Sequence, residues 1–160
     1  MGAFASMLGY AFTGMGLASI LGGGWSDVVF ATLFSILVYG ITLLSARLGP
    51  LATGWLPFTS AFIVAVLATV VKFWVPDLNL VLVTLSAVAI ILPGYTISLG
   101  AGELVAGHIA SGAANLMTGL ICLFKQVAGG YLGVVGAGFF VPMAATGGTI
   151  PIAPICLWLL

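Results

Sequence analysis

Charged side chains are so sparse in this chain that they divide it into long apolar blocks. Only 4% of its 160 residues are charged, whereas a soluble domain usually carries about 25%. The charged residues are Asp27, Arg47, Lys72, Asp77, Glu103 and Lys125. The long uncharged stretches between them are 1–26, 28–46, 48–71, 78–102, 104–124 and 126–160. A membrane-spanning helix needs about 20 mostly apolar residues, so this spacing predicts an all-α integral membrane protein that crosses the bilayer several times.

The same composition argues against several other classes of protein. The net charge is zero, so the chain offers no basic surface to nucleic acid. Its two cysteines, Cys122 and Cys156, lie in apolar stretches and do not form a metal-binding spacing. With one histidine, and without paired carboxylates or a phosphate-binding loop, no catalytic set can be placed. We therefore expect that the protein is not an enzyme and uses no metal, no cofactor and no nucleic-acid partner.

The order of apolar runs and helix breakers predicts about five transmembrane helices. They are expected at 4–21, at 28–46, at 51–71, from near Leu78 onward, and from 104 to about 138. The fourth is broken at Pro93-Gly94, because proline removes a backbone donor and clashes with the preceding turn. The fifth is longer than one crossing requires, so we expect it to be either tilted or broken near Gly129-Gly130.

The last twenty residues are expected to differ from the membrane domain at 1–140. Three prolines indicate a loop over 141–154, and 155–160 has the composition of the truncated start of a sixth helix. Tryptophan rings favour the headgroup region of a bilayer. The four tryptophans, all near predicted helix ends, are Trp25, Trp55, Trp74 and Trp158. We interpret them as an interfacial belt, the alternative being ordinary packing residues.

Two features near the middle of the chain could carry function. A helix broken at Pro93-Gly94 frees backbone carbonyls, which inside a membrane must find a partner or line a cavity, although a plain kink would leave the same pattern. Glu103 stands between two apolar blocks, and a carboxylate at membrane depth tends to mark an ion or substrate pathway. Glu103 could equally begin the fifth helix at the membrane surface, where the helix dipole would favour it; both interpretations stay open.

A polar stripe follows on the predicted fifth helix. Its members, at steps of three and four residues, are His108, Ser111, Asn115, Thr118, Cys122 and Lys125. Residues at this spacing share one helix face, and such a face turns toward a pathway or toward partner helices. We favour pathway lining over simple helix association. Further along, Gly129 and Gly133 are spaced to let another helix approach closely.

The motifs in this region resemble the threonine/serine exporter (ThrE-like) family. The matching elements are Leu92-Pro93-Gly94-Tyr95, Glu103-Leu104, Ser111-Gly112 and the upstream turn GGGWSD at 22–27. The resemblance covers roughly residues 5–140. It implies a secondary transporter that exports small hydrophilic metabolites, typically threonine and serine, driven by the proton gradient. Such proteins combine a five-span first half, which this chain resembles, with a five-span second half on the same chain or a separate one.

The resemblance and the polar pattern together define a predicted substrate pathway. Its residues are Pro93, Gly94, Tyr95, Ser98, Glu103, His108, Ser111, Gly112, Asn115 and Thr118. Glu103 and His108 are the candidates for proton coupling, since histidine titrates near neutral pH. Many relatives carry an arginine soon after the Ser-Gly pair, where this chain has Asn115. That departure puts the substrate in doubt if the arginine contacts an anionic group.

The expected partners follow from the same reasoning. They are the lipid bilayer, a small-molecule substrate, a second half of the exporter on a separate chain or in a missing C-terminal part, and a further copy of the chain. The expected location is the plasma membrane. Two alternatives stay open: a non-transporting membrane subunit whose polar stripe only binds a partner half, and a channel for small solutes.

Overall fold

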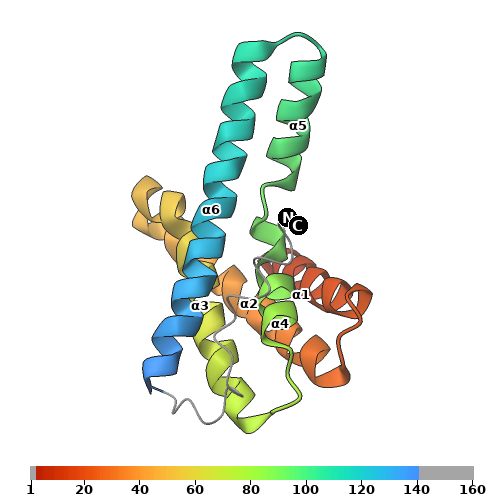
Figure 1. Ribbon diagram of the computed structural model, residues 1–160, viewed down its shortest axis with the longest axis vertical. Coiled ribbons are helices and arrows are strands. Elements are labelled where there is room, and N and C mark those ends of the chain that lie inside the picture. The colour runs from red at the N-terminus through yellow and green to blue at the C-terminus, as the bar shows by residue number, and fades with distance from the viewer. Residues whose placement is uncertain (1–2, 141–160) are drawn as a thin grey trace.

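The regular elements of the protein are helices throughout residues 3–140, the part of the chain that the computed structural model describes (Figure 1). They are α1 (Ala3–Ile20), α2 (Trp25–Leu48), α3 (Pro50–Trp74), α4 (Leu80–Val88), η1 (Ala89–Ile91), α5 (Gly94–Val105) and α6 (Ile109–Phe140). The short η1 is a 3₁₀ helix. The prediction of an all-α protein is therefore confirmed. The predicted loop at 141–154 and helix start at 155–160 lie outside the described residues.

Three of these helices are long and apolar enough to cross a membrane, namely α2, α3 and α6. The fourth candidate is a bent pair in which Leu80–Ile91 and Gly94–Val105 meet at 62°, which confirms the predicted break at Pro93-Gly94. Helix α1 is apolar over Phe4–Ile20 but shorter than α2, α3 and α6. The five predicted helices are therefore all present, with three to four of them meeting the length expected of a span.

The boundary between α5 and α6 differs from the prediction. The fifth helix was expected to follow Glu103 directly, yet α5 continues to Val105 and α6 begins only at Ile109. The reason is Gly107, whose φ of 85° lies in the left-handed region that favours glycine, so the chain turns there instead. Glu103 thus lies in the last turn of α5, and its predicted alternative place at the start of the fifth helix is wrong.

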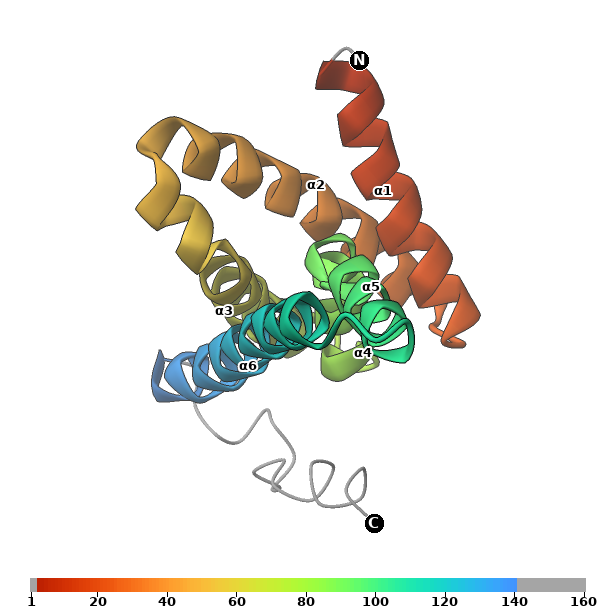
Figure 2. The same cartoon turned by 90° about the horizontal axis from the view of Figure 1, so that it is seen from above.

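Helix α6 runs unbroken through Gly129-Gly130, so of the two predicted alternatives the break is wrong. Its 32 residues extend over about 48 Å at 1.5 Å per residue. That length exceeds the roughly 30 Å hydrocarbon core of a bilayer. α6 lies along the long axis of the molecule (Figure 1), whereas α1 and α2 are most extended in the view from above (Figure 2).

Helices α1 to α4 form a bundle with a core of small apolar side chains. Its buried members are Ala18, Ala31, Phe34, Val38, Ala61, Val64, Ala68, Leu78, Val83, Ala87 and Val88. Helices α1 and α2 approach closely where Gly14 faces Ser35 and the Ala31 carbonyl. A side chain at Gly14 would occupy the space of the Ser35 side chain, so the glycine sets the helix separation.

A buried carboxylate ties two turns of this bundle together. Asp27 is only 5% exposed, and its Oδ2 accepts from the Gly24 backbone N–H at 3.0 Å while Oδ1 accepts from the Asn79 N–H at 2.8 Å. Hydrogen bonds to a charged acceptor are among the stronger ones in proteins. Asp27 therefore joins the turn before α2 to the loop before α4, which lies 52 residues away.

Helix α6 joins the bundle through a seam with α3. A Cβ added at Gly133 would stand 2.6 Å from the Phe62 carbonyl oxygen, and one at Gly129 would collide with the Phe58 carbonyl. The predicted close approach at Gly129 and Gly133 is confirmed. The upper part of α6 packs on α5, and α5, its turn and residues 109–124 form a hairpin that extends beyond the bundle of α1 to α4 (Figure 1).

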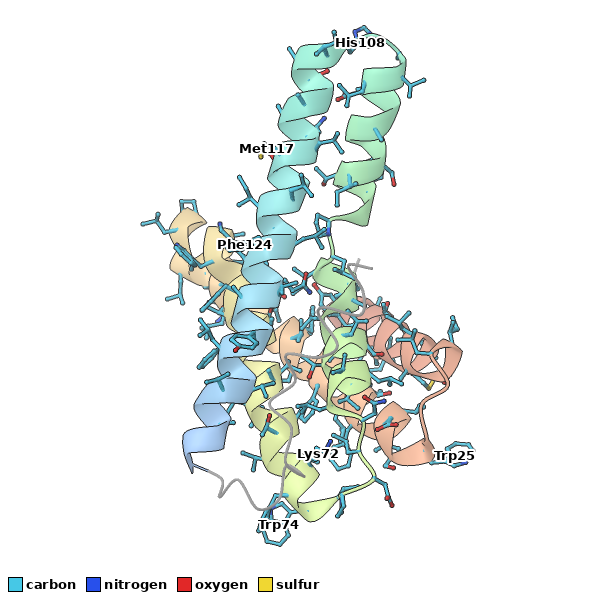
Figure 3. All side chains as sticks on the ribbon, viewed as in Figure 1. Trp25, Lys72, Trp74, His108, Met117 and Phe124 are labelled. Atoms are coloured by element: carbon cyan, nitrogen blue, oxygen red, sulfur yellow. The ribbon has the colours of Figure 1, made fainter. Side chains whose placement is uncertain are left out.

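The two ends of the molecule differ in their side chains. Trp25, Lys72 and Trp74 lie near one end, and His108 lies at the tip of the hairpin at the other (Figure 3). Trp25 and Trp74 stand at the start of α2 and the end of α3, and both are exposed. This is where amphipathic rings are placed in an interfacial belt. The fourth tryptophan, Trp158, lies outside the described residues.

Candidate functional site

The break between α4 and α5 begins with a change of backbone hydrogen bonding. The chain tightens into η1, where the Leu92 N–H donates to the Ala89 carbonyl at 3.0 Å. Pro93 has no N–H to continue the helix, and α5 restarts with the Ile97 N–H donating to the Pro93 carbonyl at 3.0 Å. Carbonyls at the end of α4 therefore lie beyond the regular helical pattern and need other donors.

Side chains from two other helices supply those donors. The Gln126 Nε2 of α6 donates to the Val88 carbonyl at 3.1 Å, and the Ser35 Oγ of α2 approaches the Ala87 carbonyl at 3.4 Å while donating to Ala31 at 2.8 Å. Gln126 and Ser35 are 6% and 1% exposed. Side chains of both α2 and α6 thus contact the broken end of α4.

The same region holds buried polar atoms that lack partners among the described residues. They are the Ser86 Oγ, the Thr84 Oγ1 and the Gln126 Oε1. Leaving a buried polar atom without a partner costs free energy. Together with the carbonyls at the end of α4, they make the neighbourhood of the break a polar patch inside an apolar bundle.

A second polar feature lies in the hairpin. Asn115 Nδ2 donates to the Glu103 Oε2 at 2.8 Å, across the contact between α5 and α6. Both side chains are partly buried. The two helices approach closely because Gly100 and Gly112 face each other, with a Cβ at Gly112 reaching within 2.8 Å of the Gly100 carbonyl oxygen. The glycines therefore bring Asn115 within reach of the Glu103 carboxylate.

The charge of Glu103 has little compensation from its surroundings. Within residues 3–140, the amide of Asn115 is the only side-chain partner of its carboxylate, and no cation pairs with it. Glu103 lies in the last turn of α5, where the helix dipole is negative and disfavours an anion. A carboxylate in apolar surroundings is costly unless it is paired.

The break and the Glu103–Asn115 pair are separate places in the structure. Nearly all of α5 lies between Gly94 and Glu103, which corresponds to about 14 Å along the helix. The structure thus brings Glu103 and Asn115 together and leaves Pro93 and Gly94 at the other end of α5. Tyr95, beside the break, is 80% exposed, and Ser98 is exposed as well.

The remaining predicted residues lie along α6 and its preceding turn. His108 is in the turn at the hairpin tip (Figure 3), exposed, and its carbonyl accepts from the Ser111 Oγ at 3.4 Å. Thr118 is exposed and its hydroxyl bonds back to the Ala114 carbonyl at 2.8 Å. Gly112 is buried against α5 and serves the helix contact.

The lower end of the polar stripe reaches α3 instead of α5. The Lys125 Nζ donates to the Gly54 carbonyl at 2.9 Å and stands 5.2 Å from the centre of the Trp55 ring, a cation–π distance. Cys122, a free cysteine, is partly buried one turn above. Met117 and Phe124 lie on the exposed side of α6 (Figure 3). The stripe therefore contacts two different helices along its length.

Gln126 is a polar residue near the break that the sequence reasoning missed. It does not fall on the polar stripe, but on a buried face where Gly112, Gly119, Gln126 and Gly133 recur every seven residues. A glutamine within a row of glycines on an apolar helix is itself a signal, because a polar side chain placed where helices touch needs a partner across the contact. That signal identifies Gln126 but not the Val88 carbonyl that it contacts.

Apolar helices of spanning length, joined by short turns and interrupted by one bent pair, define an integral multi-pass membrane protein. The chain also matches a family model described as "Putative threonine/serine exporter" over residues 1–154. It therefore belongs to the threonine/serine exporter family, whose description is that of a transporter and not of an enzyme. Neither the curated proteins nor the solved structures contain a significant match to the chain.

Proposed function

We propose that this chain is one half of a proton-coupled secondary transporter that exports small hydrophilic metabolites such as threonine and serine. The observation that carries the proposal is the Glu103 carboxylate, which is half-buried in an apolar hairpin and, within residues 3–140, is bound by no side chain other than the Asn115 amide. Ionisable side chains in such surroundings commonly belong to ion or substrate pathways. Family membership supports threonine or serine as the exported substrate.

In this proposal the membrane half comprises residues 1–140 and works in the plasma membrane with a second half of the exporter. The pathway contains Pro93, Gly94 and the polar face of α6, and Glu103 carries the coupled proton. His108 is the second candidate, at the tip of the hairpin. The bent pair supports this arrangement, because broken helices often surround the substrate sites of transporters.

The proposal is tested by uptake of labelled serine and threonine into proteoliposomes under an imposed pH gradient. The chain is reconstituted alone and together with a matched second half. We expect gradient-dependent flux only from the combined preparation, and Glu103→Gln should abolish the response to the gradient. Asp77→Asn is the matched control, because Asp77 is an exposed acid in the loop before α4. Flux in Glu103→Gln equal to that of the unmodified protein would remove Glu103 from the mechanism.

The alternative of a non-transporting subunit is favoured by the exposed apolar side chains of the hairpin, among them Val105, Ile109 and Phe124. It is distinguished by the accessibility of Cys122 to an aqueous thiol reagent, measured in a Cys156→Ser background so that only one thiol reacts. Pathway lining predicts modification of Cys122 that serine or threonine slows. Protection of Cys122 in the complex regardless of substrate, together with absent flux, would favour the subunit. Flux that ignores the proton gradient would instead favour a channel.

A further inference from the structure

The Glu103–Asn115 pair of the hairpin carries a single charge, which is negative. On α5, α6 and their turn, the titratable side chains are Tyr95, Glu103, His108, Cys122, Lys125 and Tyr131. Lys125 is committed to α3 through the Gly54 carbonyl, ten residues and about 15 Å along α6 from Asn115. His108 meets Glu103 through the backbone, where its N–H donates to the Glu103 carbonyl at 2.8 Å. No cationic side chain of the described part of the chain pairs with the Glu103 carboxylate.

Most of the atoms at this pair that remain available are acceptors. Asn115 uses one N–H of Nδ2 to donate to the Glu103 Oε2. The second carboxylate oxygen, the Asn115 carbonyl oxygen and the second N–H of the amide are left for another group. The N-terminus of α6 follows across the turn, yet none of its backbone N–H groups donates to the carboxylate. A site with a net negative charge and two free acceptor oxygens fits a cationic donor with several N–H groups, and an alkylammonium group supplies three.

We propose that Glu103 and Asn115 form the subsite for the ammonium group of the transported solute. The ammonium ion would donate to the free Glu103 oxygen and to the Asn115 Oδ1, replacing the missing cation in the hairpin. The pair therefore selects solutes that carry a primary ammonium group, and the negative charge of Glu103 repels a carboxylate. This inference rests on the proposed transport function and names the part of the solute that the chain recognises.

A proton and an ammonium group then compete for the same carboxylate. A carboxylate that has bound a proton is neutral and no longer attracts a cation. A proton and an ammonium group therefore exclude each other at Glu103. Such exclusion would couple outward movement of solute to inward movement of a proton through a single residue. Ammonium binding should accordingly weaken in acidic buffer, and the effect should persist in His108→Gln, since His108 contacts Glu103 only through its backbone.

The test uses two small probes that split the ends of a hydroxy amino acid. Ethanolamine carries the ammonium group and a hydroxyl, and glycolate carries the carboxylate and a hydroxyl. Binding of each to the detergent-purified full chain is measured by calorimetry at neutral pH. We expect ethanolamine to bind and glycolate not to bind. Glu103→Gln should weaken ethanolamine binding about tenfold or more, the usual size of a lost hydrogen bond to a charged group, while Asp77→Asn leaves it unchanged.

A second variant keeps the test informative if Glu103→Gln does not fold. Asn115→Arg places a cation beside Glu103 and should abolish ethanolamine binding, whereas Asn115→Gln, which keeps the amide, should weaken it less. Binding of glycolate as tight as that of ethanolamine would overturn the inference, as would absent ethanolamine binding or binding indifferent to both Glu103 and Asn115. Gradient-driven serine flux without Glu103-dependent ethanolamine binding would refute the inference alone. Glu103-dependent binding without any flux would refute the proposed transport and leave the ammonium subsite standing.

Discussion

The bundle of α1 to α4 and the α5–α6 hairpin use the same small residues for different purposes. In the bundle, small residues let large parts of four helices pack, and the buried core contains side chains from each of them. In the hairpin, the buried positions are Gly100, Gly112 and Gly119. The hairpin thus buries backbone and leaves nearly every side chain exposed or half-exposed. The buried core stabilises the bundle, whereas the exposed side chains of the hairpin are available for contact with other molecules.

The largest effect on stability is expected where the bundle depends on a buried charge. Asp27→Ala removes the acceptor of the Gly24 and Asn79 N–H groups. Two lost hydrogen bonds to a charged group should lower the free energy of unfolding by about 3 kcal/mol. The measurement is equilibrium unfolding in mixed micelles of a mild detergent and dodecyl sulfate.

Two controls make this prediction specific. Asp77→Ala removes an acid of the same type that is exposed, so it should change stability by less than about 0.5 kcal/mol. Asp27→Asn keeps one carbonyl oxygen as an acceptor and should fall between the two. Equal losses for Asp27→Ala and Asp77→Ala would show that the hydrogen bonds of Asp27 to Gly24 and Asn79 contribute nothing to stability.

A smaller effect is expected at the seam between α3 and α6. In Gly129→Ala the new Cβ collides with the Phe58 carbonyl, and backbone atoms packed in a bundle cannot easily move away. Overpacking of this kind should lower the free energy of unfolding by about 2 kcal/mol. Gly130→Ala is the neighbouring control, because a Cβ there meets nothing within 4 Å. Since alanine is the better helix former, Gly130→Ala should be neutral or stabilising. A loss of stability equal to that of Gly129→Ala would contradict the close packing of α3 and α6 at Gly129.

The sequence was sufficient for the features that depend on neighbouring residues. Charges and breakers placed α2 and α3 within a few residues, and Pro93 predicted the bent pair because proline acts on its own turn. The contact between Gln126 and the Val88 carbonyl, 38 residues apart, could not be predicted, because it depends on how separate helices pack. The predicted start of the fifth helix directly after Glu103 is wrong, because the turn is made at Gly107 and α6 begins at Ile109.

The candidate site shows the same division between local and long-range information. Glu103 and Asn115 were both selected from the sequence as polar residues in apolar surroundings, but nothing in their spacing indicated that they would touch. They meet because the turn at Gly107 reverses the chain and the Gly100–Gly112 contact draws α5 and α6 together. A periodicity argument assumes one continuous helix, so it cannot detect a pair formed across a hairpin.

The smallest effect on stability is expected at the glycine contact inside the hairpin, and it sharpens the comparison between the two regions. Gly112→Ala places a Cβ 2.8 Å from the Gly100 carbonyl oxygen, a contact with backbone like the one at Gly129 but less tight. Helix α5 packs mainly on α6, however, so it can move outward without disturbing the bundle. The helix propensity gained by alanine offsets part of the remaining cost, and the net loss should stay below about 1 kcal/mol.

The matched control for this substitution is Gly102→Ala, where a Cβ meets nothing within 4 Å. The informative result lies in the contrast between stability and binding. If α5 moves away in Gly112→Ala, the Asn115 amide loses reach of the Glu103 carboxylate, so ethanolamine binding should fall while the unfolding free energy hardly changes. Gly102→Ala should leave both quantities unchanged. A loss in Gly112→Ala as large as that in Gly129→Ala would instead mean that the hairpin is held as rigidly as the bundle, and that its exposed side chains belong to a surface of fixed shape.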